Sequence, residues 1–273
     1  MTILRVTIFV PYCQRLEDNS HLELCFTYLR NQTQKVHQII VMDDSEEKDR
    51  PDIKRLCKRY KADYLEFPYV DHAPAFSRKF NKGFEIATGD ALVILCANWC
   101  LGKDWIEKMT DMMVRRGNHC ILVCDNARQA MGEAGSDPGD KTRPLYDWYQ
   151  RYPDKRWDRR SDGSWIIPDE FREGNFMLVD TGFLMMVHRD YWLPWDETAD
   201  PPADDPSQWP EKGAWHAVSE WGYRMLVSSG RDMEMWVKRS LDANHLEMPA
   251  RTDTRWVRQT EVATQWLRSK GVP

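Results

Sequence analysis

The stretch Ala91-Leu92-Val93-Ile94-Leu95-Cys96-Ala97-Asn98 decides the fold. Its first six residues form the most apolar run of the chain, which is typical of a strand buried on both faces in a parallel sheet. Two similar runs lie upstream, at 6–10, closed by Pro11, and at 37–42. A shorter strand is predicted at 64–67.

Amphipathic patterns separate these runs. Residues 19–32 place Leu22, Cys25, Phe26 and Leu29 at helical spacing, and further helices are predicted at 53–60 and at 76–87, before Gly89. Strands that alternate with helices predict an α/β fold, with a mostly parallel sheet and helices on both faces. Ligands bind such sheets at the carboxyl ends of the strands.

Composition narrows the class of protein. The chain has 273 residues, of which 42% are hydrophobic and 30% charged, as in a globular protein. No apolar run approaches the roughly 20 residues of a membrane span, and the net charge of -5 disfavours a general nucleic-acid binder. Residues 1–6 show no signal-peptide pattern, so we expect a cytoplasmic protein with seven reduced cysteines.

Two C-x3-C pairs, Cys96/Cys100 and Cys120/Cys124, raise the alternative of a zinc site. Structural zinc sites usually show a tighter C-x2-C spacing. Cys120 and Cys124 flank an apolar run, where cysteine acts as a small hydrophobic residue, and we favour that interpretation.

A resemblance rests on three segments in order: Val10-Pro11-Tyr12, Met42-Asp43-Asp44-Ser45, and Asn81 with Ala87-Thr88-Gly89-Asp90 before the apolar strand. Together they resemble the nucleotide-binding half of GT-A glycosyltransferases, most closely the inverting family-2 type. The resemblance covers about residues 4–100, with weaker similarity at 180–245. It implies one continuous GT-A domain, with a nucleotide-sugar-binding half at 1–125 and an acceptor-binding half at 126–273.

The resemblance assigns donor-binding roles at two strand ends. Asp44, with Asp43 as the alternate, would accept hydrogen bonds from the base of a nucleotide-sugar, which we expect to be a UDP-sugar. Pro11 and Tyr12 would line the base or the ribose. The alternative interpretation of Asp43-Asp44-Ser45 is a turn that caps the next helix.

The helix at 76–87 supplies two more donor-side residues. Arg78 would approach the diphosphate, for which the planar guanidinium is well suited, and Asn81 would pack against the active-site strand. The alternative interpretation is that Arg78 and Lys79 belong to a solvated helix face.

The family's Asp-x-Asp signature, which holds Mn²⁺ or Mg²⁺ against the diphosphate, falls on Cys96-Ala97-Asn98. Both carboxylates are replaced, and the amide oxygen of Asn98 is a poor sole ligand for a hard dication. Three alternatives follow: Asn98 and His245 hold a metal together, arginines meet the diphosphate charge, or donor binding is lost. His245 lies where the family carries a late metal-binding histidine, although an ordinary loop histidine is the alternative.

The catalytic base is expected in the second half of the chain. Glu220 precedes Arg224 by four residues in a pattern similar to the family's base-bearing helix, and a structural ion pair is the alternative. His216 is the second candidate for the base. On the acceptor side, Trp195-Asp196-Glu197 resembles the family's aromatic-Asp-Glu turn, and Asp180-Thr181-Gly182 precedes a strand expected to line the acceptor.

The identity of the acceptor stays open between a glycan, a protein and a hydroxymethylated DNA base. Residues 148–160 interleave aromatic and cationic side chains, a mixture that suits a sugar, single-stranded nucleic acid or a solvated surface loop. Nine of the 13 tryptophans lie between Trp148 and Trp236, which favours a ring-bearing acceptor. The alternative functions are a catalytically impaired nucleotide-binding module and a nucleotidyltransferase.

Overall fold

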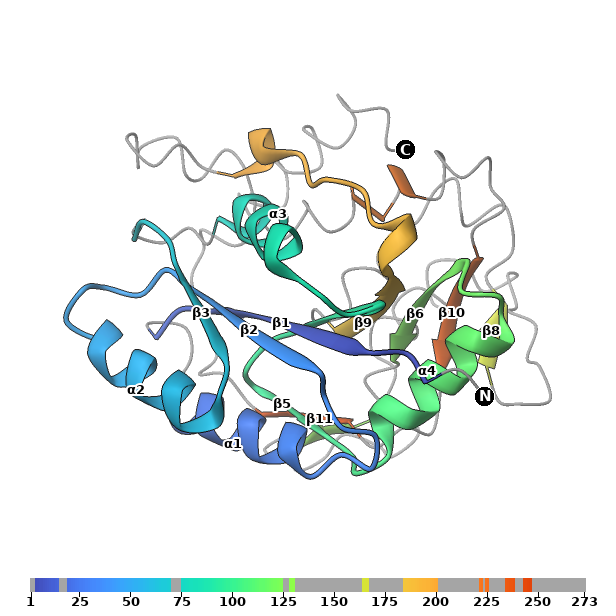
Figure 1. The fold of residues 1–273 in the computed structure, drawn as a ribbon, viewed down its shortest axis with the longest axis horizontal. Helices are drawn as coiled ribbons and strands as arrows, with labels where there is room; N and C mark the ends of the chain where they lie inside the picture. The colour runs from blue at the N-terminus through green and yellow to red at the C-terminus, as the bar shows by residue number, and fades with distance from the viewer. Residues whose placement is uncertain are drawn as a thin grey trace.

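A computed structural model describes residues 3–14, 19–69, 75–124, 128–130, 164–166, 184–200, 221–222, 224–225, 234–238 and 243–246. Its main feature is an eight-stranded sheet in the order β3-β2-β1-β4-β9-β6-β10-β8 (Figure 1). The strands are β1 Val6–Tyr12, β2 Gln38–Asp43, β3 Asp63–Glu66, β4 Ala91–Leu95, β6 Cys120–Cys124, β8 Ser164–Ile166, β9 Leu184–His188 and β10 Glu234–Lys238.

The sheet is mostly parallel, as the sequence predicts. β1 pairs in parallel with both β2 and β4, and β2 pairs in parallel with β3. β9 runs antiparallel between β4 and β6, whereas β10 is parallel to β6. Segments from the second half of the chain therefore extend the sheet that the first half begins.

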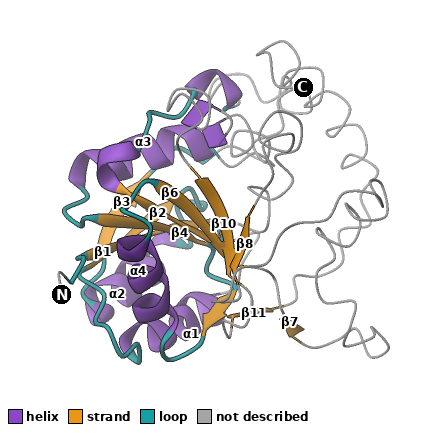
Figure 2. Cartoon of the chain, turned by 90° about the vertical axis from the view of Figure 1, so that its right-hand side faces the viewer, coloured by secondary structure: helices purple, strands orange, loops and turns teal. Residues whose placement is uncertain are grey.

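Helices cover both faces of the sheet. In Figures 1 and 2, α3 lies over one face, and α1, α2 and α4 lie across the other. The bounds are α1 Asn19–Arg30, α2 Arg50–Tyr60, α3 Phe76–Ile86 and α4 Trp105–Arg115. A second sheet, in the order β5-β11-β7, is formed by β5 Trp99–Leu101, β7 Arg128–Ala130 and β11 Ala243–Leu246.

Side-chain periodicity accounts for the packing of the first helix. The buried residues of α1 are Leu22, Cys25, Phe26 and Leu29, the stripe that the spacing predicts. On the opposite face, α3 approaches the sheet through Gly83, where an added Cβ would lie 2.9 Å from Met42 Sδ and 3.2 Å from the Phe9 ring. The glycine therefore sets how closely α3 packs on β1 and β2.

The structure corrects the predicted elements in two places. β1 continues through Pro11 to Tyr12, because beyond Phe9 the strand pairs only with β2, and one missing N–H is tolerated there. α4 and β5 are not among the elements that the sequence predicts. β5 is buried, and α4 buries one stripe, formed by Trp105, Ile106, Met109, Met112 and Met113.

Aromatic side chains fill the space between α3 and the segment 192–200. Trp195 stacks on Trp221, with 4.7 Å between centroids and 13° between planes, and lies 4.5 Å from the Phe80 ring. Trp192 stacks on Phe84 at 5.8 Å. These three tryptophans are buried, so their rings pack in the protein interior rather than on an exposed surface. The apolar surface that their large rings bury stabilises the fold.

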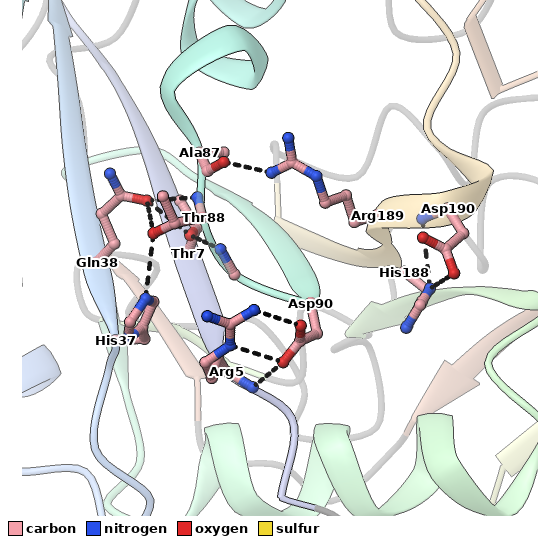
Figure 3. A network of polar contacts seen from close by, with 11 residues as sticks. Arg5, Thr7, His37, Gln38, Ala87, Thr88, Asp90, His188, Arg189 and Asp190 are labelled. Atoms are coloured by element: carbon pink, nitrogen blue, oxygen red, sulfur yellow. Dashed lines mark hydrogen bonds and ion pairs between the residues drawn. The ribbon is translucent and has the colours of Figure 1, made fainter.

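The amino ends of β1 and β4 meet in a polar network (Figure 3). The Thr7 hydroxyl accepts from Gly89 N at 2.9 Å and donates to Gln38 Oε1 at 3.0 Å. A Cβ at Gly89 would lie 2.7 Å from Thr7 N, so only glycine fits between these strands. The Ala-Thr-Gly-Asp segment thus fixes the entry into β4, far from the carboxyl ends of the strands.

None of the helices in the described ranges has both the length and the apolar character that crossing a membrane requires.

Candidate active site

The loops that follow β1 and β2 are joined at the carboxyl ends of the strands. Asp44 N donates to Tyr12 O at 3.2 Å, and Gln14 N donates to Ser45 Oγ at 2.8 Å. Tyr12 itself is buried, and its hydroxyl donates to Asn19 Oδ1 at 2.9 Å. The two predicted donor-binding segments are therefore neighbours, although the Tyr12 ring is turned into the protein.

Asp43 holds the turn after β2. Its carboxylate is buried and accepts hydrogen bonds from Ser45 N at 2.8 Å and from the Tyr64 hydroxyl at 2.6 Å. Burial, together with this bond, raises the pKa of Tyr64, so the phenol stays a donor. Asp43 therefore holds a turn, as the alternative interpretation predicts, but the segment does not cap the next helix, because α2 has Asp49 at its N-cap.

Asp44 makes a different contact. Its Oδ1 lies 2.7 Å from the ammonium of Lys79, and the two side chains are only 3% and 1% exposed. Lys79 Nζ also donates to Tyr12 O at 3.3 Å. A buried ion pair thus joins α3 to the carboxyl ends of β1 and β2.

Lys79 is not among the predicted site residues, and the solvated-face alternative is wrong for it, because its side chain is 1% exposed. The signal was its spacing: Lys79 lies three residues after Phe76 and four before Gly83, on the buried stripe of α3. A lysine on an apolar stripe predicts a buried partner, since an unpaired charge in the core is costly.

Arg78 lies at the amino end of α3 beside Asp200. Asp200 Oδ1 accepts from Ser77 N at 2.9 Å, and Oδ2 accepts from Arg78 N at 2.7 Å and from Arg78 Nε at 3.3 Å. Burial raises the pKa of Asp200, while these three hydrogen bonds act in the opposite direction. Arg78 is 30% exposed and therefore reaches the surface at this end of the sheet.

Asn81 connects residues that the sequence assigns to donor and acceptor sides. Its Oδ1 accepts from Trp195 N at 2.7 Å, and its Nδ2 donates to Trp195 O at 3.0 Å and to Glu197 Oε1 at 2.9 Å. Asp196 begins the short 3-10 helix η3, Glu197–Ala199, by accepting from Thr198 N at 2.9 Å. The Trp-Asp-Glu turn is therefore fastened to α3, the helix that carries Arg78.

The residues at the Asp-x-Asp position are neutral. Asn98 is buried and Cys96 is half-buried at the end of β4. β11 pairs with β5 so that the backbone of His245 lies opposite Trp99, next to Asn98. Burial raises the pKa of nearby Cys100 to about 11, which disfavours a thiolate ligand.

This donor set fits a hard dication poorly. Mn²⁺ and Mg²⁺ prefer carboxylate oxygens, whereas Asn98 offers an amide oxygen and His245 an imidazole. Across the part of the chain that the structure describes, no three His, Cys, Asp or Glu side chains come together as a metal site requires.

Several predicted site residues lie outside the described residues, namely His216, Glu220, Asp180, Gly182 and the stretch 148–160. The structure nevertheless describes residues 221, 222, 224 and 225, which follow Glu220. Trp221, the next residue, stacks on Trp195 and donates from Nε1 to Leu193 O at 2.7 Å. Arg224 donates to Pro194 O at 2.8 Å. The segment that follows Glu220 is thus packed on the Trp-Asp-Glu turn.

A mostly parallel sheet in this order, with acidic residues after β2 and a helix bearing Arg78 beside them, defines a glycosyltransferase of GT-A fold. The model of the family "Glycosyl transferase family 2" matches residues 7–181, and the chain belongs to this family. No curated protein sequence matches the chain.

Solved structures agree on the fold. TarS of S. aureus superposes with a TM-score of 0.52 at 9% identity, covering 96% of this chain but 40% of that protein. Glucosyl-3-phosphoglycerate synthase from Mycobacterium tuberculosis, solved with Mn²⁺, UDP-glucose and glycerol 3-phosphate, gives 0.55 at 13% identity, covering 99% of this chain and 81% of that one. A further mycobacterial protein gives 0.56 at 13% identity, covering 99% and 76%.

Proposed function

We propose that this glycosyltransferase moves a sugar from a UDP-sugar to a hydroxyl acceptor by a single displacement with inversion. The observation that carries the proposal is the buried Asp44–Lys79 pair at the carboxyl ends of β1 and β2. Burying charged side chains costs on the order of several kcal/mol per ion, so a benefit outside protein stability has to offset this cost. Recognition of a base edge is a use that justifies it.

In the proposed complex, the base pairs with both members of this ion pair. The Asp44 carboxylate accepts the imide N–H of uracil, and the Lys79 ammonium, which has three protons, donates to a neighbouring carbonyl oxygen. The diphosphate then extends toward Arg78 on the same helix. UDP-glucose binding by the mycobacterial synthase supports this choice of donor.

The leaving group requires positive charge. In the proposed site, the Arg78 guanidinium stabilises the charge that develops on the diphosphate, because both carboxylates of the metal signature are replaced. Asn98 and His245 are the residues that would hold a metal if one binds. A dication there would supply further charge stabilisation.

The proposed reaction is a single displacement, in which the acceptor gains the sugar and UDP leaves. The Glu220 carboxylate takes the proton of the acceptor hydroxyl, with His216 as the alternative base, and the acceptor oxygen attacks the anomeric carbon. The bond from that carbon to the diphosphate oxygen breaks, and UDP leaves with the electron pair. The acceptor, a glycan, a protein or a hydroxymethylated DNA base, would lie against Asp180, Gly182 and the Trp195–Glu197 turn.

Nucleotide-sugar binding is the first test. We expect UDP and UDP-sugars to raise the melting temperature of the protein more than ADP does, and we expect EDTA to leave this shift in place. Sugar release should be lost in Glu220→Gln with UDP binding retained, and NMR of the product should show an inverted anomeric centre. The absence of stabilisation by any nucleotide would exclude the proposal.

One observation favours a second function. The neutral Cys96 and Asn98 are also what a nucleotide-binding module without turnover would tolerate. Tight UDP binding without sugar release, across glycan, protein and DNA acceptors, would establish that alternative.

A further inference from the structure

The segment 192–200 runs along α3 in the opposite direction and is fastened to it at three levels. Trp192 stacks on Phe84, with 5° between the ring planes. One turn toward the start of the helix, Asn81 brackets the backbone of Trp195. In Figure 1 the gold segment passes over α3 and ends near the start of the helix.

The third level is Asp200 at the amino end of α3. The helix has Ala75 at its N-cap, which supplies no side-chain hydrogen bond. Asp200 takes this role from more than a hundred residues away, because its carboxylate accepts from Ser77 N and Arg78 N. Its side chain is 0% exposed, and a carboxylate at a helix amino terminus is favoured by the free N–H groups and by the helix dipole.

A helix cap needs only the bonds to the backbone N–H groups of Ser77 and Arg78. The third hydrogen bond of the Asp200 carboxylate goes to a side chain instead. Oδ2 of Asp200 also accepts from Nε of Arg78 at 3.3 Å. Nε is the inner edge of the planar guanidinium, so this contact fixes the plane and the direction of the group. Arg78 therefore has one edge tied to a fully buried carboxylate while the side chain remains partly exposed.

We infer that Asp200 is a positioning residue for donor binding: it holds the Arg78 guanidinium in the orientation that receives the diphosphate of the nucleotide-sugar. This inference rests on the proposed function, in which Arg78 meets the diphosphate. An arginine ordered before binding loses less rotamer entropy when the ligand arrives. Asp200 also links the donor site to the segment that carries the Trp-Asp-Glu turn.

The test compares two ligands that differ only in the diphosphate. Binding of UDP and of uridine is measured by NMR titration for the wild type, Asp200→Asn and Arg78→Met. For Asp200→Asn we expect UDP binding roughly three- to tenfold weaker, from the cost of ordering one flexible side chain, and uridine binding unchanged. In the Arg78→Met background, Asp200→Asn should have no further effect on UDP.

Thr198→Val is the matched control, because it removes the hydroxyl bond to Asp196 in the same segment and leaves the Asp200 carboxylate in place. It should bind UDP as the wild type does. If Asp200→Asn does not fold, Asp200→Glu keeps the charge but displaces it, and should weaken UDP while sparing uridine.

The results separate a failure of the proposed Arg78 role from a failure of the Asp200 inference. If Arg78→Met leaves UDP binding unchanged, the proposed role of Arg78 is wrong. If Arg78→Met weakens UDP binding while Asp200→Asn does not, the inference about Asp200 alone is wrong. Equal weakening of UDP and uridine by Asp200→Asn would show a merely structural cap and overturn the inference as well.

Discussion

Polar side chains gather at both ends of β1 and β4, but the two ends use them in different ways. At the amino ends the network is mostly neutral, and the side chains of its Arg5–Asp90 ion pair are 56% and 34% exposed (Figure 3). At the carboxyl ends the Asp44–Lys79 pair is almost fully buried. Exposed pairs contribute little to stability, whereas buried charges cost stability unless they are paired.

This difference indicates that the amino-end contacts serve the fold, whereas the carboxyl-end charges serve ligand binding. The amino-end contacts join strands whose order they fix, and water already solvates their charges. The carboxyl-end charges lie where α/β sheets bind ligands, in positions where an apolar pair would pack at lower cost. Four experiments test whether the two ends differ in this way.

The largest effect is expected at Lys79. Lys79→Met leaves the Asp44 carboxylate buried without its ammonium, and the free energy of unfolding should fall by about 3–5 kcal/mol. Urea denaturation measures this loss. The double variant Asp44→Leu/Lys79→Met should recover most of the stability and still fail to bind UDP. An unchanged urea midpoint for Lys79→Met would contradict the comparison.

Gly89 tests the amino end. In Gly89→Ala the new Cβ meets Thr7 N at 2.7 Å and Arg5 O at 2.8 Å, both of them backbone atoms. Overpacking of this kind costs about 1–3 kcal/mol, and UDP affinity of the folded protein should be unaffected. Lys58→Ala, at an exposed position of α2, serves as the control. A fall in UDP affinity would show that the two ends are coupled.

Asp200 and Asp90 should give opposite pH dependences. Burial raises the folded pKa of Asp200, so its contribution to stability is present below the unfolded pKa of about 3.9 and is lost as pH rises through the folded pKa. The Arg5 hydrogen bond lowers the pKa of Asp90, so its contribution is present above the unfolded pKa and is lost as pH falls. Urea denaturation of each Asp→Asn variant against the wild type, from pH 3 to 7, checks both signs. Parallel curves would refute the assignment.

The smallest effect is expected from Asp90→Asn at neutral pH. Its ion pair with Arg5 is largely solvated, and salt screens such a pair. The change in melting temperature should be small and should shrink further in 1 M NaCl. A large fall in melting temperature that persists in high salt would show that the Arg5–Asp90 pair matters for stability as much as the buried pair does.

Much of the fold follows from local patterns. The stripe from Leu22 to Leu29, the apolar run at 91–95 and the acidic turn after β2 each repeat or end within a few residues, so the sequence predicts the element and its buried face. The donor-side location of Asp44 follows from the same reasoning, since the carboxyl ends of parallel strands meet at one edge.

The partners of the site residues do not follow from such patterns. Asp200 meets Arg78 across 122 positions, and Asn81 meets Trp195 across 114. No period in the sequence marks contacts of this length. The sequence does carry a signal for α4, since its buried apolar residues recur at helical spacing from Trp105 to Met113. β5 has only three residues, and so short an apolar run does not distinguish a strand from a helix.

The sequence by itself determined the alternation of strands and helices over residues 6–95, the family and the edge of the sheet where the donor is expected, because periodicity and chain order encode these. Only the tertiary structure decided that Lys79 is buried against Asp44, that Asn81 ties α3 to the Trp-Asp-Glu turn, and that Asp200 caps α3. These contacts depend on which segments the sheet and its helices bring together, and that placement results from packing of the whole domain rather than from any local preference.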